Sequence, residues 1–174
     1  MTDFEIKQKV LGAQNGNTGA FGELYSFAAK DAYRFALWYI KDPFLAEDAV
    51  QEAAIKAYKS IKSLKKPASF KNWFMSILLN CCKDALSERE LSHIAPDGDE
   101  TLQNMPYYDS YESGDVTRAL KKLSETDRKI ILLSVLGEFK SGEIAEDLGM
   151  TATAVRSRLS RALQFLRTEM EKEQ

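Results

Sequence analysis

The stretch LGEFKSGEIAEDLGMTATAVRSRLSRALQFL, residues 136–166, predicts two helices joined by a tight turn. An apolar face that includes Ile144 and Leu148 indicates the first helix, Gly149 breaks it, and Thr151 or Ala152 begins the next. At about 100° per residue, the second helix has one apolar face, comprising Ala152, Val155, Leu159, Ala162, Leu163 and Leu166.

The other side of the second helix is basic and rich in hydroxyl groups. It carries Thr153, Ser157, Ser160 and Arg161, flanked by Arg156 and Arg158. A short packed helix, a glycine turn and an Arg/Ser-faced helix are what a helix-turn-helix needs to enter a major groove. The alternative is an ordinary helical hairpin with a solvated basic side. The pattern favours DNA binding.

Length and charge divide the chain into parts. A chain of 174 residues allows one domain or two small ones. The net charge of −2 conceals +3 over residues 1–87, −7 over residues 88–115 and +2 over residues 116–174. We therefore expect two mildly basic domains, 1–87 and 116–174, joined by a flexible acidic linker at 88–115. The negative whole-chain charge does not argue against nucleic-acid binding, because it hides this distribution.

No apolar run approaches the roughly 20 residues that span a bilayer, and the N-terminus is not typical of a signal peptide. We therefore expect a cytoplasmic protein.

The first domain contains a helix from about Phe44 to Ile61 whose two faces differ. One face is small and apolar and predicts packing, with Ala46, Ala49, Val50, Ala53, Ala57 and Ile61. The other carries Asp48, Gln51, Glu52, Ile55 and Lys59. A single exposed isoleucine is normal on a surface, but an apolar centre with an acidic rim also suits a docking patch. Both interpretations stay open on the pattern alone.

A short basic loop at 64–70 contains Lys65, Lys66 and Ser69 and leads into a third helix with apolar residues at helical spacing, namely Phe70, Trp73, Phe74, Ile77 and Leu78. Lysines beside exposed aromatic rings can hold single-stranded DNA by phosphate contact and stacking. The alternative, aromatic rings in the core and lysines in solvent, is favoured by this segment alone. In the second domain, Ser124 is a good N-cap with Asp127 three residues later.

The sequence gives no support to an enzyme. His93 is the single histidine, so a histidine-based triad or metal cluster has no partners, and no GxxxxGK[ST] or GxGxxG phosphate loop is present. We interpret Cys81 and Cys82 as small core residues in preference to redox sensors, although the nearby Lys83 is able to lower a thiol pKa. We expect no catalytic residue, no metal and no cofactor.

Five segments in this order resemble the extracytoplasmic-function (ECF) group of bacterial sigma-70-type RNA polymerase sigma factors. They are AFGELY (20–25), AEDAVQEAAIKAY (46–58), SFKNWFMSILLN (69–80), ALKKLSETDRK (119–129) and EIAEDLGMTATAVRSRLSRA (143–162). The resemblance spans about residues 20–167 and implies an all-α fold of two small helical domains, one like sigma region 2 and one like the sigma region 4 helix-turn-helix. It implies a promoter-specificity factor that binds core RNA polymerase and promoter DNA.

The resemblance also implies roles for individual residues. Asp48, Gln51, Glu52 and Ile55 match the face that docks on the clamp helices of the largest polymerase subunit. Lys56, Ile77, Asn80 and Lys83 match positions that engage the non-template strand of the minus-10 element. So does the loop from Lys65 through Lys66 to Ser69, and in the family this loop holds a flipped-out base in a pocket. Arg156, Ser157, Ser160 and Arg161 match the face that recognises the minus-35 element, with Arg158 beside them for phosphate.

Further partners follow from the resemblance: the flap region of polymerase for the C-terminal domain, and an anti-sigma factor. Two departures stand out. The usual basic segment after the melting helix is thinned to CCKDALSERE (81–90), and Lys140 replaces the usual Ser/Thr cap, so that Ser141 is expected to cap one residue later. Two other classes stay open: a sigma mimic that sequesters an anti-sigma factor, and a stand-alone helix-turn-helix repressor.

Overall fold

The computed structural model describes residues 1–91 and 118–172, which belong to two compact units. Every regular element in these two ranges is a helix. The predicted all-α fold class is therefore confirmed. Most of the predicted linker, residues 92–115, lies outside the described residues.

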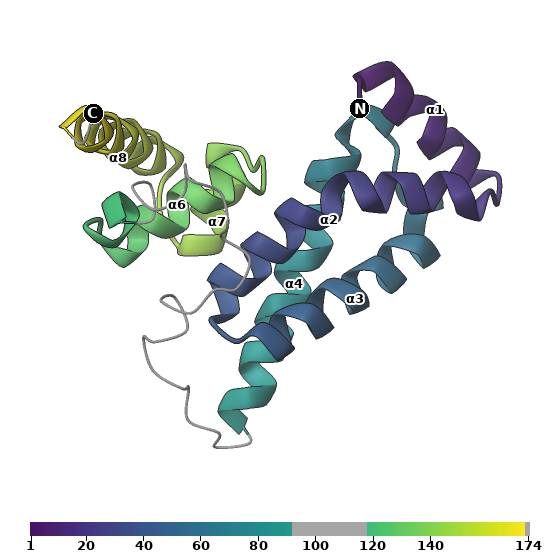
Figure 1. Ribbon diagram of the computed structural model, residues 1–174, viewed down its shortest axis with the longest axis horizontal. Helices are drawn as coiled ribbons and strands as arrows, with labels where there is room; N and C mark the ends of the chain where they lie inside the picture. Colours follow the sequence, from purple (N-terminus) through teal and green to yellow (C-terminus); the bar gives the residue numbers. More distant parts are fainter. Residues whose placement is uncertain (92–117, 173–174) are drawn as a thin grey trace. The chain divides into compact units, whose positions relative to one another are not determined.

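The first unit is a bundle of α-helices with a short irregular connection before the last one (Figure 1). Its elements are α1 (Asp3–Gln14), α2 (Thr18–Ile40), α3 (Pro43–Ser60), the 3₁₀ turns η1 (Ile61–Ser63) and η2 (Pro67–Ser69), and α4 (Phe70–Leu91). Helices α2, α3 and α4 pack on one another, while α1 packs against α2 and against both turns. The connection between α3 and α4 is therefore backed by α1.

Alanines line the inner side of α3. Ala46, Ala53 and Ala57 are fully buried, and Ala49 and Val50 are nearly so. Because alanine side chains are short, α2 and α4 can approach α3 closely along this side. The predicted packing face of α3 is confirmed, and the opposite face of the helix is left for solvent.

The aromatic rings of α4 belong to the core. Phe70 and Phe74 are fully buried, and their ring centroids lie 6.0 Å apart. Phe21 packs edge-on against Phe70 with a centroid distance of 6.5 Å. Such pairs stabilise a core beyond the area they bury. Of the two interpretations of these rings, the core packing is correct for Phe70 and Phe74, whereas Trp73 is half-buried.

Helix α3 begins at a cap that the sequence specifies. The Asp42 carboxylate accepts hydrogen bonds from the backbone N–H groups of Phe44 and Leu45 at 2.9 and 3.1 Å, and Pro43 occupies the first helical position. An acceptor at the N-cap satisfies N–H groups that have no partner within the helix.

The end of α4 lies beyond the predicted end of the first domain. We placed the end of the first domain at residue 87, and α4 runs four residues further, to Leu91. Arg89, whose side chain is mostly buried, lies 4.0 Å from the Asp42 carboxylate at the start of α3. This long-range contact is invisible in the local periodicity and gives the last turn of α4 a partner.

Cys81 and Cys82 are both buried in α4. Burial raises the pKa of the Cys82 thiol to about 12 and also raises the pKa of Cys81, because a thiolate is poorly solvated there. The cation that acts against this rise at Cys81 is Lys56. The suggestion that Lys83 lowers a thiol pKa was therefore wrong, and both cysteines are core residues.

The second unit contains a short helical segment at 118–121 followed by α6 (Glu125–Val135), α7 (Ser141–Leu148) and α8 (Ala152–Lys172). Helix α8 packs against α6 and α7. One buried cluster joins the 118–121 segment, α6 and α8. Its central residues are Ala119, Ile131, Ala162 and Leu166. Val155 and Ile144 are almost completely buried as well.

One residue predicted to lie on the apolar face of the second helix is exposed. Leu163 on α8 is 44% exposed, and Val135 at the end of α6 is also exposed. Few helices surround α8, so only part of its circumference is covered, and Phe165 packs against the core cluster instead of Leu163. Within the described residues, no helix is both long enough and apolar enough to cross a membrane.

Ion pairs tie the ends of the second unit together. Lys122, just before α6, bonds to Glu169 near the end of α8, and Lys172 bonds to the same carboxylate at 2.8 Å. These two ammonium groups lower the pKa of Glu169 to about 2. The far end of α8 is thereby connected to the start of the unit.

Candidate DNA- and polymerase-binding surfaces

The turn between α7 and α8 has the geometry that a helix-turn-helix requires. Gly149 adopts a left-handed conformation with φ of +63°, which favours glycine, and ends α7. Thr151 then caps α8, because its hydroxyl accepts a hydrogen bond from the backbone N–H of Ala154 at 3.2 Å. The predicted break at Gly149 and restart at Thr151 or Ala152 are confirmed.

The start of α7 differs from our expectation. Ser141 was expected to cap this helix, but Lys140 occupies the N-cap position and its backbone N–H donates to the Glu143 carboxylate at 2.7 Å. This is the half of a capping box in which a carboxylate in the first turn accepts from the N-cap N–H, and that carboxylate also interacts favourably with the helix dipole. No side chain at the N-cap accepts from the following N–H groups, so the start of α7 depends on Glu143.

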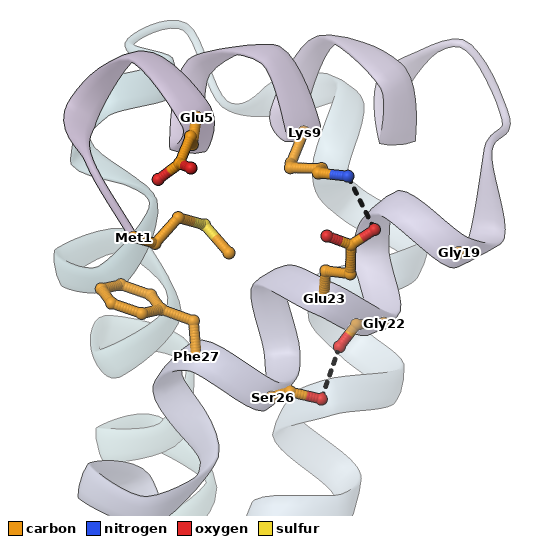
Figure 2. A pocket seen from close by; sticks show the side chains of 8 residues that line it. All are labelled: Met1, Glu5, Lys9, Gly19, Gly22, Glu23, Ser26 and Phe27. Carbon is orange, nitrogen blue, oxygen red and sulfur yellow. Dashed lines mark hydrogen bonds and ion pairs between the residues drawn. The ribbon is translucent and has the colours of Figure 1, made fainter.

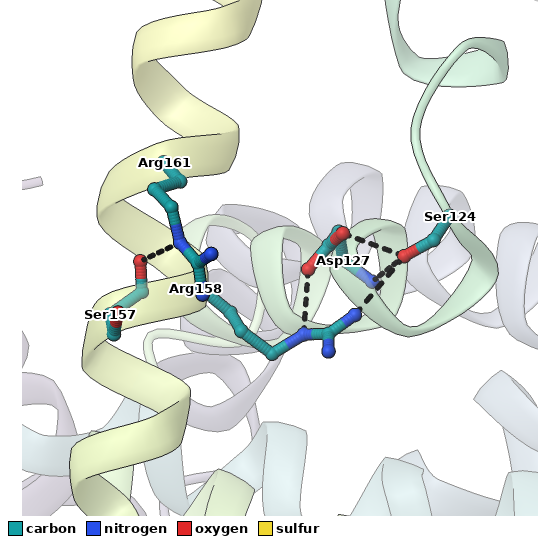
Figure 3. Close-up of polar contacts among 5 residues, drawn as sticks. All are labelled: Ser124, Asp127, Ser157, Arg158 and Arg161. Atoms are coloured by element: carbon teal, nitrogen blue, oxygen red, sulfur yellow. Dashed lines mark hydrogen bonds and ion pairs between the residues drawn. The ribbon is translucent and has the colours of Figure 1, made fainter.

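The outer face of α8 carries five exposed polar residues, namely Thr153, Arg156, Ser157, Ser160 and Arg161. The guanidinium of Arg156 donates to the Thr153 hydroxyl at 3.1 Å. Figure 3 shows the second contact, in which Arg161 donates to the backbone oxygen of Ser157 at 3.3 Å. Both contacts lie within α8 itself. The described part of the second unit therefore leaves this face uncovered, with two arginine groups held at its surface.

Arg158 has different surroundings from its neighbours. Its Nε donates to Asp127 Oδ1 at 2.8 Å and its Nη2 to the Ser124 hydroxyl at 3.3 Å (Figure 3). Ser124 in turn accepts from the backbone N–H of Asp127 as the N-cap of α6 and donates to its carboxylate. The predicted cap at Ser124 is confirmed. Arg158, which we expected to contact phosphate, bonds to the cap of α6 and ties α8 to that helix.

The predicted polymerase-docking residues all lie on the outward face of α3. Asp48, Gln51 and Glu52 are exposed, and Ile55 is 55% exposed beside them. Gln51 donates to Glu47 at 3.3 Å, within the same helix. The surface has the composition that the sequence predicted, an apolar centre with carboxylates around it.

The predicted minus-10 residues are divided between α3, α4 and the connection between them. Lys65, Lys66 and Ser69 are exposed around η2, Asn80 and Lys83 are exposed on α4, and Ile77 is half-buried. Lys56 lies 2.8 Å from Glu52 and 3.8 Å from Asp84. Its positive charge is therefore largely offset by two acids, and its hydrogen bond to Glu52 raises its pKa.

A hollow of about 700 Å³ lies between α1 and α2, away from the predicted surfaces (Figure 2). Lys9 and Glu23 form an ion pair at 2.7 Å across it, and the Ser26 hydroxyl donates to the backbone oxygen of Gly22. Its lining comprises Met1, Glu5, Lys9, Gly19, Gly22, Glu23, Ser26 and Phe27. None of the residues predicted to bind DNA or polymerase is among them. The described residues contain no cluster of metal-ligating side chains either.

Two family profiles match the chain, one within each of the two units. The family profile described as Sigma-70 region 2 matches residues 24–91, and the profile described as Sigma-70, region 4 matches residues 113–166. RNA polymerase sigma factor SigV of Bacillus subtilis is 33% identical over 144 residues, which cover 83% of this chain and 87% of SigV. ECF RNA polymerase sigma factor SigW of the same organism is 24% identical over 182 residues, covering 95% of this chain and 96% of SigW.

Two solved structures share the fold. One is the structure of CnrH in complex with the cytosolic domain of CnrY, with a TM-score of 0.62, 22% identity and coverage of 98% of this chain and 99% of the matched chain. The other is the sigma factor RpoE in complex with the anti-sigma factor NepR from Bartonella quintana, with a TM-score of 0.59, 22% identity and coverage of 88% and 98%.

The chain therefore belongs to the extracytoplasmic-function group of sigma-70-type RNA polymerase sigma factors. It is a promoter-specificity subunit that binds core RNA polymerase and directs transcription initiation at a particular set of promoters.

We expect Arg158→Ala to loosen α8 from α6, because it removes both bonds to the cap and leaves the Asp127 carboxylate without its cation. The pair is partly exposed, so the free energy of unfolding of the second unit should fall by about 1 kcal/mol, or about fivefold in amide exchange. Hydrogen exchange of the Ile130 and Leu133 amides measures this. Arg156→Ala is the matched control, and equal exchange in the two variants would contradict the role of Arg158.

Proposed function

We propose that the two units divide the work of promoter recognition between them. The first, residues 1–87 with the extension of α4 to Leu91, docks on core polymerase and opens the minus-10 element. The second, residues 116–174, recognises the minus-35 element, and residues 88–115 link the two. The observation that carries this proposal is the outer face of α8, where exposed Arg156, Ser157, Ser160 and Arg161 lie together and no other helix among residues 118–172 covers them.

The minus-35 element is bound, in this proposal, by the outer face of α8 in the major groove. Arginine guanidinium groups donate to base edges or to phosphates, and serine hydroxyls donate or accept at either kind of site. Arg156 and Arg161 are placed for such contacts because their present partners lie on the same helix. Arg158 contributes by holding α8, and its contact with phosphate is secondary to that role.

The minus-10 element is bound by the connection between α3 and α4 and by the outer side of α4. Lys65 and Lys66 attract the phosphates of the displaced strand. Ser69 and Asn80 supply hydrogen-bonding groups, and the half-buried Ile77 supplies an apolar contact. Capture of an unpaired base favours opening at base pairs that are easily unstacked, so melting and selectivity arise together. Lys83 adds to the phosphate contacts, whereas Lys56 adds less because Glu52 and Asp84 offset it.

Core polymerase is bound through the outward face of α3, formed by Asp48, Gln51, Glu52 and Ile55. Its exposed isoleucine supplies apolar contact and its carboxylates supply charge complementarity for a basic surface. We assign this face to the clamp helices of the largest polymerase subunit and assign the second unit a further contact with the flap region. The protein then needs no active site, metal or cofactor of its own, because polymerase performs the chemistry.

An anti-sigma factor is a further proposed partner. The support is that the structurally similar RpoE of Bartonella quintana was solved in complex with the anti-sigma factor NepR. Since its polymerase and promoter partners are cytoplasmic, we place the protein in the cytoplasm.

Run-off transcription with purified bacterial core polymerase tests the proposed function. We expect discrete transcripts from a subset of genomic fragments of the native host only when this protein is added. A sigma mimic that sequesters an anti-sigma factor, or a stand-alone repressor, would give no transcript, and that result would overturn the proposal.

Arg156→Ala and Arg161→Ala should each weaken binding of the holoenzyme to a minus-35 duplex by about tenfold or more, because each removes a donor from the recognition face. Binding to core polymerase should stay unchanged. Gel shift and pull-down measure the two affinities, and Arg167→Ala, an exposed arginine further along α8, is the control. Parallel loss of both affinities would contradict this assignment.

Asp48→Lys should abolish co-purification with core polymerase, because it reverses one of the carboxylate charges around Ile55 on the outward face of α3. Glu90→Lys, the same charge change at an exposed position of α4, should co-purify normally. A pull-down with tagged core polymerase compares the two variants. If the Asp48 variant is recovered with polymerase as well as the control is, the docking face lies elsewhere.

A further inference from the structure

Gln14, the last residue of α1, makes two hydrogen bonds across a long sequence separation. Its side-chain amide donates to the backbone oxygens of Ile61 and Leu64, each at 3.0 Å. The two acceptors are 47 and 50 residues away, at η1 and just after it. The side chain is half-buried, so water competes only partly for these bonds.

The two acceptors come directly before the loop proposed to receive an unpaired base. The backbone N–H of Leu64 also bonds to the Ile61 oxygen at 3.2 Å, and the Leu64 side chain is buried. After Leu64 the backbone turns outward, and Lys65, Lys66 and Ser69 are exposed. The buried Leu64 and the amide of Gln14 therefore both help to fix where this exposed loop begins.

The chemistry requires a side chain with two donors at the correct reach. A glutamine amide carries two N–H groups and can satisfy both carbonyls at once, whereas an ionised glutamate has none and would repel both oxygens. The support behind Gln14 is firm, because Ile6, Val10 and Ala13 of α1 are buried. Gln14 also lies outside the segment that matches the sigma region 2 profile, which begins at residue 24.

We propose that Gln14 is a positioning residue for the minus-10 pocket. It holds the loop from Leu64 to Ser69 in the conformation that accepts an unpaired base, and it does so from α1, without touching DNA or polymerase. This inference rests on the proposed assignment of that loop to the minus-10 strand. Without the two hydrogen bonds the loop samples other conformations, and a base in the pocket must then order it at the expense of affinity.

The test uses the complete chain bound to core polymerase and single-stranded minus-10 oligonucleotides from a promoter found by run-off transcription. An abasic site is placed at each position in turn, and the largest loss of affinity in the wild-type holoenzyme marks the pocketed base. Gln14→Met keeps the length of the side chain and removes its donors. In this variant we expect an abasic site at the pocketed position to cost about tenfold less affinity than it costs in the wild type. The effects of abasic sites at other positions, and the affinity for core polymerase, should stay within about twofold of the wild-type values.

Two further variants separate hydrogen-bond donation from shape. Gln14→Lys retains N–H donors and should recover the discrimination to within about threefold of the wild-type value. Gln8→Met makes the same chemical change at an exposed position of α1 and should behave as the wild type.

Unchanged discrimination in Gln14→Met would overturn the proposal, as would equal losses in the Met and Lys variants, because donation would then not matter. A fall in polymerase affinity that matches the loss of discrimination would overturn it too, since Gln14 would then merely support the fold. If no abasic position matters in the wild-type holoenzyme, the assignment of the loop to the minus-10 strand is itself wrong, and that result is visible before any variant is compared.

Discussion

The alanine side of α3 is the constraint on which the first unit depends. A row of short side chains lets α2 and α4 approach closely, and the helix has no freedom to rotate without placing larger or charged residues against them. The opposite side is then turned outward as a consequence of packing. Asp48, Gln51, Glu52 and Ile55 are exposed for this reason, and they contribute little to holding the unit together.

Helix α8 follows the same logic with fewer neighbours. Val155, Ala162 and Leu166 attach it to the rest of the unit, so its basic and hydroxyl-rich side is left uncovered. In both units, then, the residues that set the fold and the residues assigned to partners occupy different faces of one helix. Such a division allows the recognised promoter or the strength of docking to change with little effect on stability.

Local periodicity predicted most of the fold. The packing face of α3, the cap at Ser124 and the turn at Gly149 all depend on residues within a few positions of one another, and all are confirmed. The errors arose where a contact joins residues distant in sequence, or where too few neighbouring helices are present to bury an apolar position. Leu163 is exposed because the described helices of the second unit leave part of α8 uncovered, and the last turn of α4 has a distant partner in Asp42.

The candidate surfaces were predicted unequally for the same reason. Helical spacing alone placed Ser157, Ser160 and Arg161 together, but it gave no sign that Arg158 is bonded to Asp127, 31 residues earlier, or that Lys56 is shared by Glu52 and Asp84. The role of Gln14 was missed altogether, because its partners lie 47 and 50 residues away and are backbone atoms. A carbonyl acceptor leaves no signature in a sequence.

The bond between Arg158 and the cap of α6 has a consequence for the entropy of DNA recognition. A recognition helix held only by its apolar side can rock about its own axis, and binding to a groove must then remove that motion. Here the buried Val155 anchors the apolar side of α8, and Arg158 bonds the next turn of α8 to Asp127 of α6. The helix is therefore already ordered in the free protein. Less conformational entropy is left to lose on contact with the promoter, and more of the interaction energy remains as affinity.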